Sequence, residues 1–120
     1  LCAVLGELLE ALAGRVLLAH YAPAELGFVH AACLRCFGCG LLVPTVDTLQ
    51  LAQRSHRRQG REPVQGDLRL AALRTAYNLP RYASHDALVD AMATAELFLA
   101  QAEEISVAGS LRLGKLLARV

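Results

Sequence analysis

The chain has 120 residues, 55% of them hydrophobic and 19% charged, which supplies enough apolar material for a folded core and excludes a disordered polypeptide. Its formal net charge of only +1 excludes a strongly basic surface, so contact with nucleic acid must come from a local patch. No apolar run approaches the ~18 residues of a membrane-spanning helix, and nothing resembles a signal peptide. The four cysteines are therefore expected to be reduced, and the protein to be cytoplasmic without membrane contact.

The first part of the chain predicts two helices and two strands in alternation. The helices are expected over residues 4–13, where leucines repeat on one face, and over residues 23–38, which begin with proline and end with glycine. The strands are expected over residues 16–20 and 44–46. Both are short apolar runs, which are typical of strands covered on both faces in a parallel sheet.

The next segment predicts a capped helix and a basic loop. A glutamine stands three residues after Asp47, which resembles a capping box, so Asp47 is expected to cap a helix that ends near Arg54. The alternative role of Asp47 is to support the ligands of a functional site. Residues 55–66 form the expected loop, which holds the one basic cluster of the chain, including Arg57 and Arg58. Such clusters are usually solvated, and the alternative is contact with phosphate beside an active site.

Two further helices are expected after that loop. Asp67 is placed to cap the first, over residues 68–77, and Ser84 is placed to cap the second, over residues 86–104. Leucines in the tail, residues 105–120, predict a small docking helix. The long helix has apolar residues on nearly every side, which predicts a buried helix, and its main packing stripe contains Leu88, Met92, Ala95, Leu99 and Ala102.

This order of elements predicts an α/β layer structure. Only two strands are expected, and two short apolar strands make a poor sheet in water without neighbours. The chain therefore looks like the C-terminal portion of a larger domain whose first strands are missing. In this interpretation residues 1–104 belong to that domain and residues 105–120 form a tail. The leucine at position 1, in place of an initiator methionine, agrees with it.

His85 and Asp90, at the start of the long helix, are the first candidates for chemistry. Five residues of a helix turn through about 140°, so the two side chains converge only if His85 lies at or before the first turn and a bound group reaches both. Such an arrangement suits metal-assisted hydrolysis, because the carboxylate holds a cation while the imidazole moves protons. The simpler alternative is a surface histidine and an aspartate hydrogen-bonded to neighbouring backbone.

These residues resemble a known family, the DEDD exonucleases of the DEDDh subtype, which includes the proofreading subunit of bacterial DNA polymerase III and the ribonuclease T type enzymes. The third family motif, His-x4-Asp, matches His85 and Asp90. The second motif is similar to residues 16–28, with Tyr21 in place of the usual asparagine and Glu25 at the aspartate position. The first motif, Asp-x-Glu on an early strand, has no counterpart in the sequence.

The resemblance implies a ribonuclease H-like exonuclease fold and 3′–5′ hydrolysis of DNA or RNA at a two-metal site that uses Mg²⁺ or Mn²⁺. It implies that His85 is the general base and that Asp90 and Glu25 are metal ligands. Single-stranded or 3′-end nucleic acid is the implied partner, together with a possible homodimer or an association with a polymerase or another domain. The candidates for substrate contact are His20, Tyr21, Arg57 and Arg58.

Two other classes of protein fit parts of the sequence. The missing first motif and the longer side chain of Glu25 leave room for a catalytically inactive ribonuclease H-like module that binds nucleic acid or a partner protein. Cys33, Cys36 and Cys39, with His30 nearby, have the spacing of a metal or iron–sulfur site and would define a small helical interaction domain. Core packing is the expected role of Cys33 and Cys36, because both fall on the apolar stripe of their helix.

Overall fold

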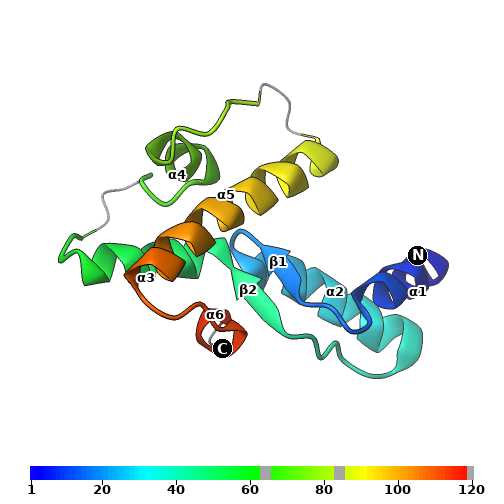
Figure 1. Cartoon of the computed structure of the whole chain (residues 1–120). Coiled ribbons are helices and arrows are strands. Elements are labelled where there is room, and N and C mark those ends of the chain that lie inside the picture. The colour runs from blue at the N-terminus through cyan, green and yellow to red at the C-terminus, as the bar shows by residue number, and fades with distance from the viewer. Residues whose placement is uncertain (63–65, 83–85, 119–120) are drawn as a thin grey trace.

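The computed structural model describes residues 1–62, 66–82 and 86–118, in which six helices surround two short parallel strands (Figure 1). These elements make an α/β fold, as the order of sequence patterns predicts. In chain order they are α1 (Cys2–Leu12), β1 (Leu17–Ala19), α2 (Ala22–Phe37), β2 (Thr45–Asp47), α3 (Thr48–Arg58), α4 (Leu70–Ala76), α5 (Ala87–Ala108) and α6 (Leu113–Leu116).

The sheet consists of β1 and β2, which pair in parallel. The C-terminal segment returns to the free edge of β2, where Val46 and Leu117 form an antiparallel bridge and the N–H of Ala118 donates to the carbonyl of Thr45 at 2.7 Å. Among the described residues, no strand lies along the other edge of β1. All three residues of β1 line the cleft in which the candidate site lies.

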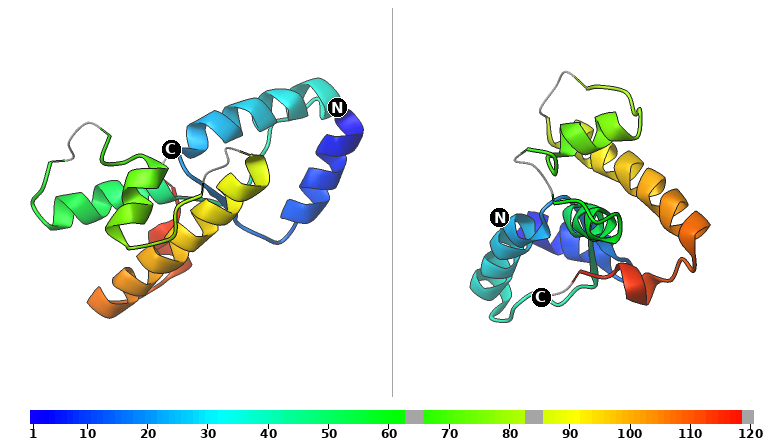
Figure 2. Two further views of the ribbon diagram at one scale, coloured as in Figure 1. Left: turned by 90° about the horizontal axis from the view of Figure 1, so that it is seen from above. Right: turned by 90° about the vertical axis from the view of Figure 1, so that its left-hand side faces the viewer.

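The core consists of two apolar clusters that fix α5 in place. One cluster joins β2, α3 and α6, and the other joins α3, α4 and α5, with Leu97 fully buried at its centre. Burial of one leucine side chain contributes about 1.5–3 kcal/mol, so these clusters hold α5 firmly against α3 and α4. Figure 2 shows α5, coloured yellow to orange, lying across these elements. The buried residues are Val46, Leu51 and Leu116 in the first cluster and Ala52, Leu73 and Leu97 in the second.

The prediction that α5 is buried on nearly every side is wrong. Its one buried face consists of Ala93, Thr94, Leu97 and Gln101. The expected packing stripe is largely exposed instead, because the described elements cover a single face of the helix; Leu88, Met92, Ala95 and Leu99 all face solvent. No described helix, α5 included, has the combination of length and apolar character that crossing a membrane requires.

The basic cluster lies on a helix rather than in a loop. Helix α3 continues past Arg54 to Arg58, so that His56, Arg57 and Arg58 form its last turn. Cations interact favourably with the negative end of a helix dipole, which gives the physical reason for the longer helix. The predicted loop is therefore shorter than residues 55–66.

Two predicted caps also differ from the structure. Helix α4 begins at Leu70 after Arg69, without a side-chain cap, so Asp67 does not cap it. Helix α5 is capped by Asp86, whose Oδ1 accepts hydrogen bonds from the backbone of Leu88 at 2.8 Å and of Val89 at 3.4 Å. The other candidate cap, Ser84, lies outside the described residues.

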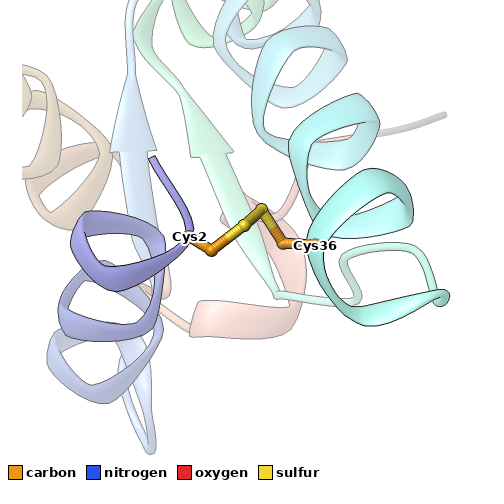
Figure 3. The surroundings of a disulfide bond; sticks show 2 residues. All are labelled: Cys2 and Cys36. Carbon is orange, nitrogen blue, oxygen red and sulfur yellow. A yellow bond between two sulfur atoms is a disulfide. The ribbon is translucent and has the colours of Figure 1, made fainter.

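A disulfide joins Cys2 of α1 to Cys36 of α2 (Figure 3). The prediction of reduced thiols is therefore wrong for this pair, and Cys36 is not a simple core thiol. Cys33 is buried as predicted, whereas the thiol of Cys39 is exposed. In the part of the chain that the structure describes, no three His, Cys, Asp or Glu residues are grouped so as to hold a metal ion, so the cysteine metal site is not formed.

Candidate active site

A cleft of about 1140 Å³ opens between β1, the start of α2, α4 and the first half of α5. It brings together Glu25, in the first turn of α2, and Asp90, in the first turn of α5. Both residues are exposed. These two are the acidic residues of the described lining, and they come from distant parts of the sequence.

The donor chemistry of this pair suits Mg²⁺ or Mn²⁺. Magnesium prefers oxygen ligands, keeps several of its waters and is commonly held by one or two carboxylates together with substrate phosphates. Glu25 and Asp90 are two carboxylates of this kind in the described cleft lining. Two ions need further oxygen ligands in addition to these two carboxylates.

Asp47 determines where the helix that carries Glu25 begins. Its carboxylate is only 1% exposed. Oδ1 accepts the backbone N–H groups of Tyr21 and Leu49, and Oδ2 accepts that of Ala22, each at 2.9 Å. One buried carboxylate therefore caps the starts of both α2 and α3. The prediction that Asp47 caps a helix is confirmed, and its contact with α2 is an addition to it.

Tyr21 lies at the turn from β1 into α2. Its backbone is left-handed, with φ of 66°, and its side chain is 54% exposed. Tyr21 contributes a backbone N–H to Asp47 in this arrangement. The described cleft lining does not include it.

His20 lines the cleft, and both of its ring nitrogens are used within the fold. Nδ1 lies 2.7 Å from Oγ1 of Thr48, and Nε2 lies 2.9 Å from the carbonyl of Leu68. A carbonyl only accepts hydrogen bonds, so Nε2 donates, and in the neutral imidazole Nδ1 accepts from the threonine hydroxyl. His20 thus ties the end of β1 to α3 and to the turn before α4.

Protonation of His20 is disfavoured in the folded chain. Burial lowers the pKa of His20 below its usual 6.5, against the opposing effects of the hydrogen bond to Leu68 and of the carboxylates of Asp47 and Glu25. As the pH falls below 6.5, the unfolded chain binds a proton at His20 before the folded chain does. The stability contributed by His20 is therefore fully present above this pH and is lost below it, with a slope of at most about 1.4 kcal/mol per pH unit.

We therefore expect acid to destabilise the protein partly through His20. Urea unfolding at about pH 7.5 and about pH 5.5 measures the loss. The His20→Asn variant should show a smaller loss of unfolding free energy between the two conditions than the unchanged chain. Equal losses in the unchanged chain and in His20→Asn would contradict the assignment.

Arg74 lines the cleft and joins the segment after α4 to α5. Its side chain is 5% exposed, with Nη1 donating to the carbonyl of Ala93 at 2.8 Å and Nη2 to that of Pro80 at 2.7 Å. The guanidinium pairs with Glu96 at 3.0 Å and lies 4.8 Å from the ring centroid of Tyr82. The Tyr82 hydroxyl donates to Glu96 at 2.7 Å, and this hydrogen bond lowers the pKa of Glu96.

The role of Arg74 was missed in the sequence. Its one signal is a single arginine in the otherwise small and apolar helix α4, Leu70–Ala76. The contacts that use it come from Pro80, Ala93 and Glu96, so sequence spacing alone does not reveal them.

The predicted basic contacts lie elsewhere in the fold. Arg57 and Arg58 are exposed in the last turn of α3, and neither lines the cleft. Arg58 lines a second, smaller pocket of about 270 Å³ with Arg54 and Lys115. Arg54 donates there to the carbonyls of Lys115 at 2.7 Å and Leu117 at 3.1 Å, which holds α6 against α3.

His85, the predicted general base, lies outside the described residues. The described part of the chain resumes at Asp86, directly after it. The first turn of α5 then opens into the cleft through Ala87, Val89 and Asp90. The sequence position of His85 is therefore next to the helix start that borders the cleft.

The comparisons with known proteins identify the family. The family model RNase_T, described as Exonuclease, matches residues 1–98. No curated protein and no solved structure matches the chain. The matched region contains the whole described lining of the cleft, which supports a nuclease activity with nucleic acid as the substrate class. Since the match covers well over half of its residues, the chain belongs to the exonuclease family.

Proposed function

We propose that the cleft is the active site of a metal-dependent 3′–5′ exonuclease with a ribonuclease H-like fold, acting on the 3′ end of DNA or RNA. One observation supports this most strongly. Glu25 and Asp90 line a single cleft in a chain that belongs to the exonuclease family. Glu25 lies in the first turn of α2 and Asp90 in the first turn of α5.

In this proposal each residue has one role. Asp90 and Glu25 hold Mg²⁺ or Mn²⁺, which when bound supplies positive charge to the phosphoryl oxygens and lowers the pKa of a bound water. His85 takes the proton from the attacking water, the usual task of a histidine general base. In the DEDDh subtype that the chain resembles, further metal ligands come from the first motif, Asp-x-Glu, which has no counterpart in this sequence.

A labelled oligonucleotide tests the activity and its direction. With Mg²⁺ or Mn²⁺ present, the complete protein should shorten a 5′-labelled single strand stepwise from its 3′ end. Asp90→Asn and Glu25→Gln should each lower the rate by at least about 10–100-fold, the cost of losing even a residue that only supports a metal ligand. Glu7→Gln is the matched control, because Glu7 is exposed on α1 and outside the cleft lining.

A second measurement separates the base from the ligands. His85→Ala should lower the rate by about 10²–10⁴-fold while leaving the affinity for Mn²⁺ unchanged, because a general base does not hold the ion. Asp90→Asn should lower both the rate and the affinity, which the electron paramagnetic resonance of Mn²⁺ reads directly. If His85→Ala cleaves as fast as the unchanged chain, the general-base assignment is wrong.

The alternative is a catalytically inactive module that binds nucleic acid or a partner protein. It is favoured by the presence of only two carboxylates in the described cleft lining, one of them the longer Glu25. In the active enzyme, Glu25→Asp should keep or raise the rate. An oligonucleotide that binds the unchanged chain and Glu25→Asp equally well, and is cleaved by neither, would favour the inactive module.

A further inference from the structure

We propose that Cys36 is a thiol–disulfide exchange site that bonds to either Cys2 or Cys39. The bond to Cys2 holds α1 against α2, and exchange to Cys39 releases α1. In the structure Cys36 is bonded to Cys2, across the gap between α1 and the last turn of α2 (Figure 3). Cys39 follows Cys36 with the Cys-x-x-Cys spacing that characterises many redox-active pairs. Its thiol is free and exposed.

The disulfide accounts for much of the attachment of α1. Helix α1 packs mainly against α2, and its one buried residue is Leu5. Figure 2 shows α1, coloured dark blue, at the edge of the molecule and away from α3 and α4. With a single buried side chain to hold it, α1 should come away from α2 once Cys2 is released. The two states of Cys36 therefore differ in the docking of a whole helix.

The exchange step balances without an external oxidant or reductant. The thiolate of Cys39 attacks Sγ of Cys36, so that the Cys36–Cys39 bond forms as the Cys2–Cys36 bond breaks. Cys2 leaves as a thiolate and takes up a proton. The left-handed Gly38, with φ of 72°, ends α2 and turns the chain between the two cysteines. Cys33 is the less suitable attacking group, because it is buried inside the fold.

Proteolysis without reduction distinguishes the two states. Arg15 is the first tryptic site, and Arg35 precedes Cys36 directly. The segment that ends at Arg15 therefore stays attached to the segment containing Cys36 in the starting state, and is released after exchange. Chymotryptic cleavage after Phe37 separates Cys36 from Cys39, so mass spectrometry shows which cysteine is bonded to which.

The experiment uses the full oxidised chain, incubated with a trace of reduced glutathione and then blocked with N-ethylmaleimide before digestion. Both disulfides are expected. Leu5→Ala weakens the docking of α1 and should raise the ratio of the Cys36–Cys39 form to the starting form by about tenfold or more. Val4→Ala, at an exposed position of the same helix, should change it by less than about twofold.

A second variant tests the new bond without relying on the docking of α1. Cys2→Ser removes the competing partner, so the conditions that oxidise the unchanged chain should produce the Cys36–Cys39 disulfide. The proposal fails if both thiols stay reduced in this variant. It also fails if Leu5→Ala leaves the ratio of the two disulfides unchanged. Neither readout depends on nuclease activity.

Discussion

Asp47→Ala is expected to lower the free energy of unfolding by about 3–5 kcal/mol, since it leaves several N–H groups at two helix starts without an acceptor. The lost contacts are those of the carboxylate with Tyr21, Ala22 and Leu49. An unsatisfied buried donor costs about 1–3 kcal/mol, and the exposure of Tyr21 lets water replace part of its bond. The expected loss of stability is therefore smaller than three times the full cost of an unsatisfied buried donor.

Chemical unfolding followed by circular dichroism measures this loss, and Asp86→Ala provides the comparison. Asp86 also caps a helix, but it is exposed, so its removal should cost about 0.5–2 kcal/mol. The loss of stability for Asp47→Asn should lie between the losses for Asp47→Ala and Asp86→Ala. The one remaining oxygen can still accept from Tyr21 and Leu49, while the amide group faces the N–H of Ala22. A loss no larger than that of Asp86→Ala would contradict the double-cap interpretation.

Arg74→Met is expected to lower the free energy of unfolding by about 2–3 kcal/mol. The substitution keeps an unbranched chain inside the fold but removes the donors to the carbonyls of Pro80 and Ala93. Glu96 is 38% exposed, so water hydrates the carboxylate that loses its partner. For this reason the cost should stay below the ~3–5 kcal/mol of breaking a fully buried ion pair.

Two companion variants separate charge from geometry in that network. Arg74→Lys keeps the positive charge but loses the planar fork that reaches two carbonyls at once, so it should recover only part of the stability. Arg35→Met, at an exposed position in the last turn of α2, should change stability by less than about 1 kcal/mol. Full recovery in Arg74→Lys would mean that charge alone accounts for the contribution of Arg74.

Local signals predicted much of the fold. The glycine after α2 and the proline in its first turn bound that helix closely, because a left-handed cap and a fixed φ depend only on the residue itself. Asp47 was recognised as a cap for the same reason, since its contact with Leu49 spans two residues. The predicted end of α3 and start of α4 were wrong, because helix-dipole and packing effects outweigh the local sequence signals for helix ends.

The candidate site was predictable only as a set of residue types. Glu25 and Asp90 could be chosen as carboxylates with the right neighbours, but nothing in their spacing shows that one cleft contains both. His20 could be chosen as the end of a strand, whereas its bonds to Thr48 and Leu68 could not. A contact between distant residues depends on how the elements pack, which periodicity does not encode.

By itself, the sequence determined the order of the helices and strands, the cap at Asp47 and the acidic candidates for the site. Only the tertiary structure decided which face of α5 is buried, that Asp47 also caps α2, and that Cys2 is bonded to Cys36. The physical reason is the range of the interactions. Helix caps, turns and hydrophobic periods act over a few residues, whereas burial, buried hydrogen bonds and disulfides join segments that only folding brings together.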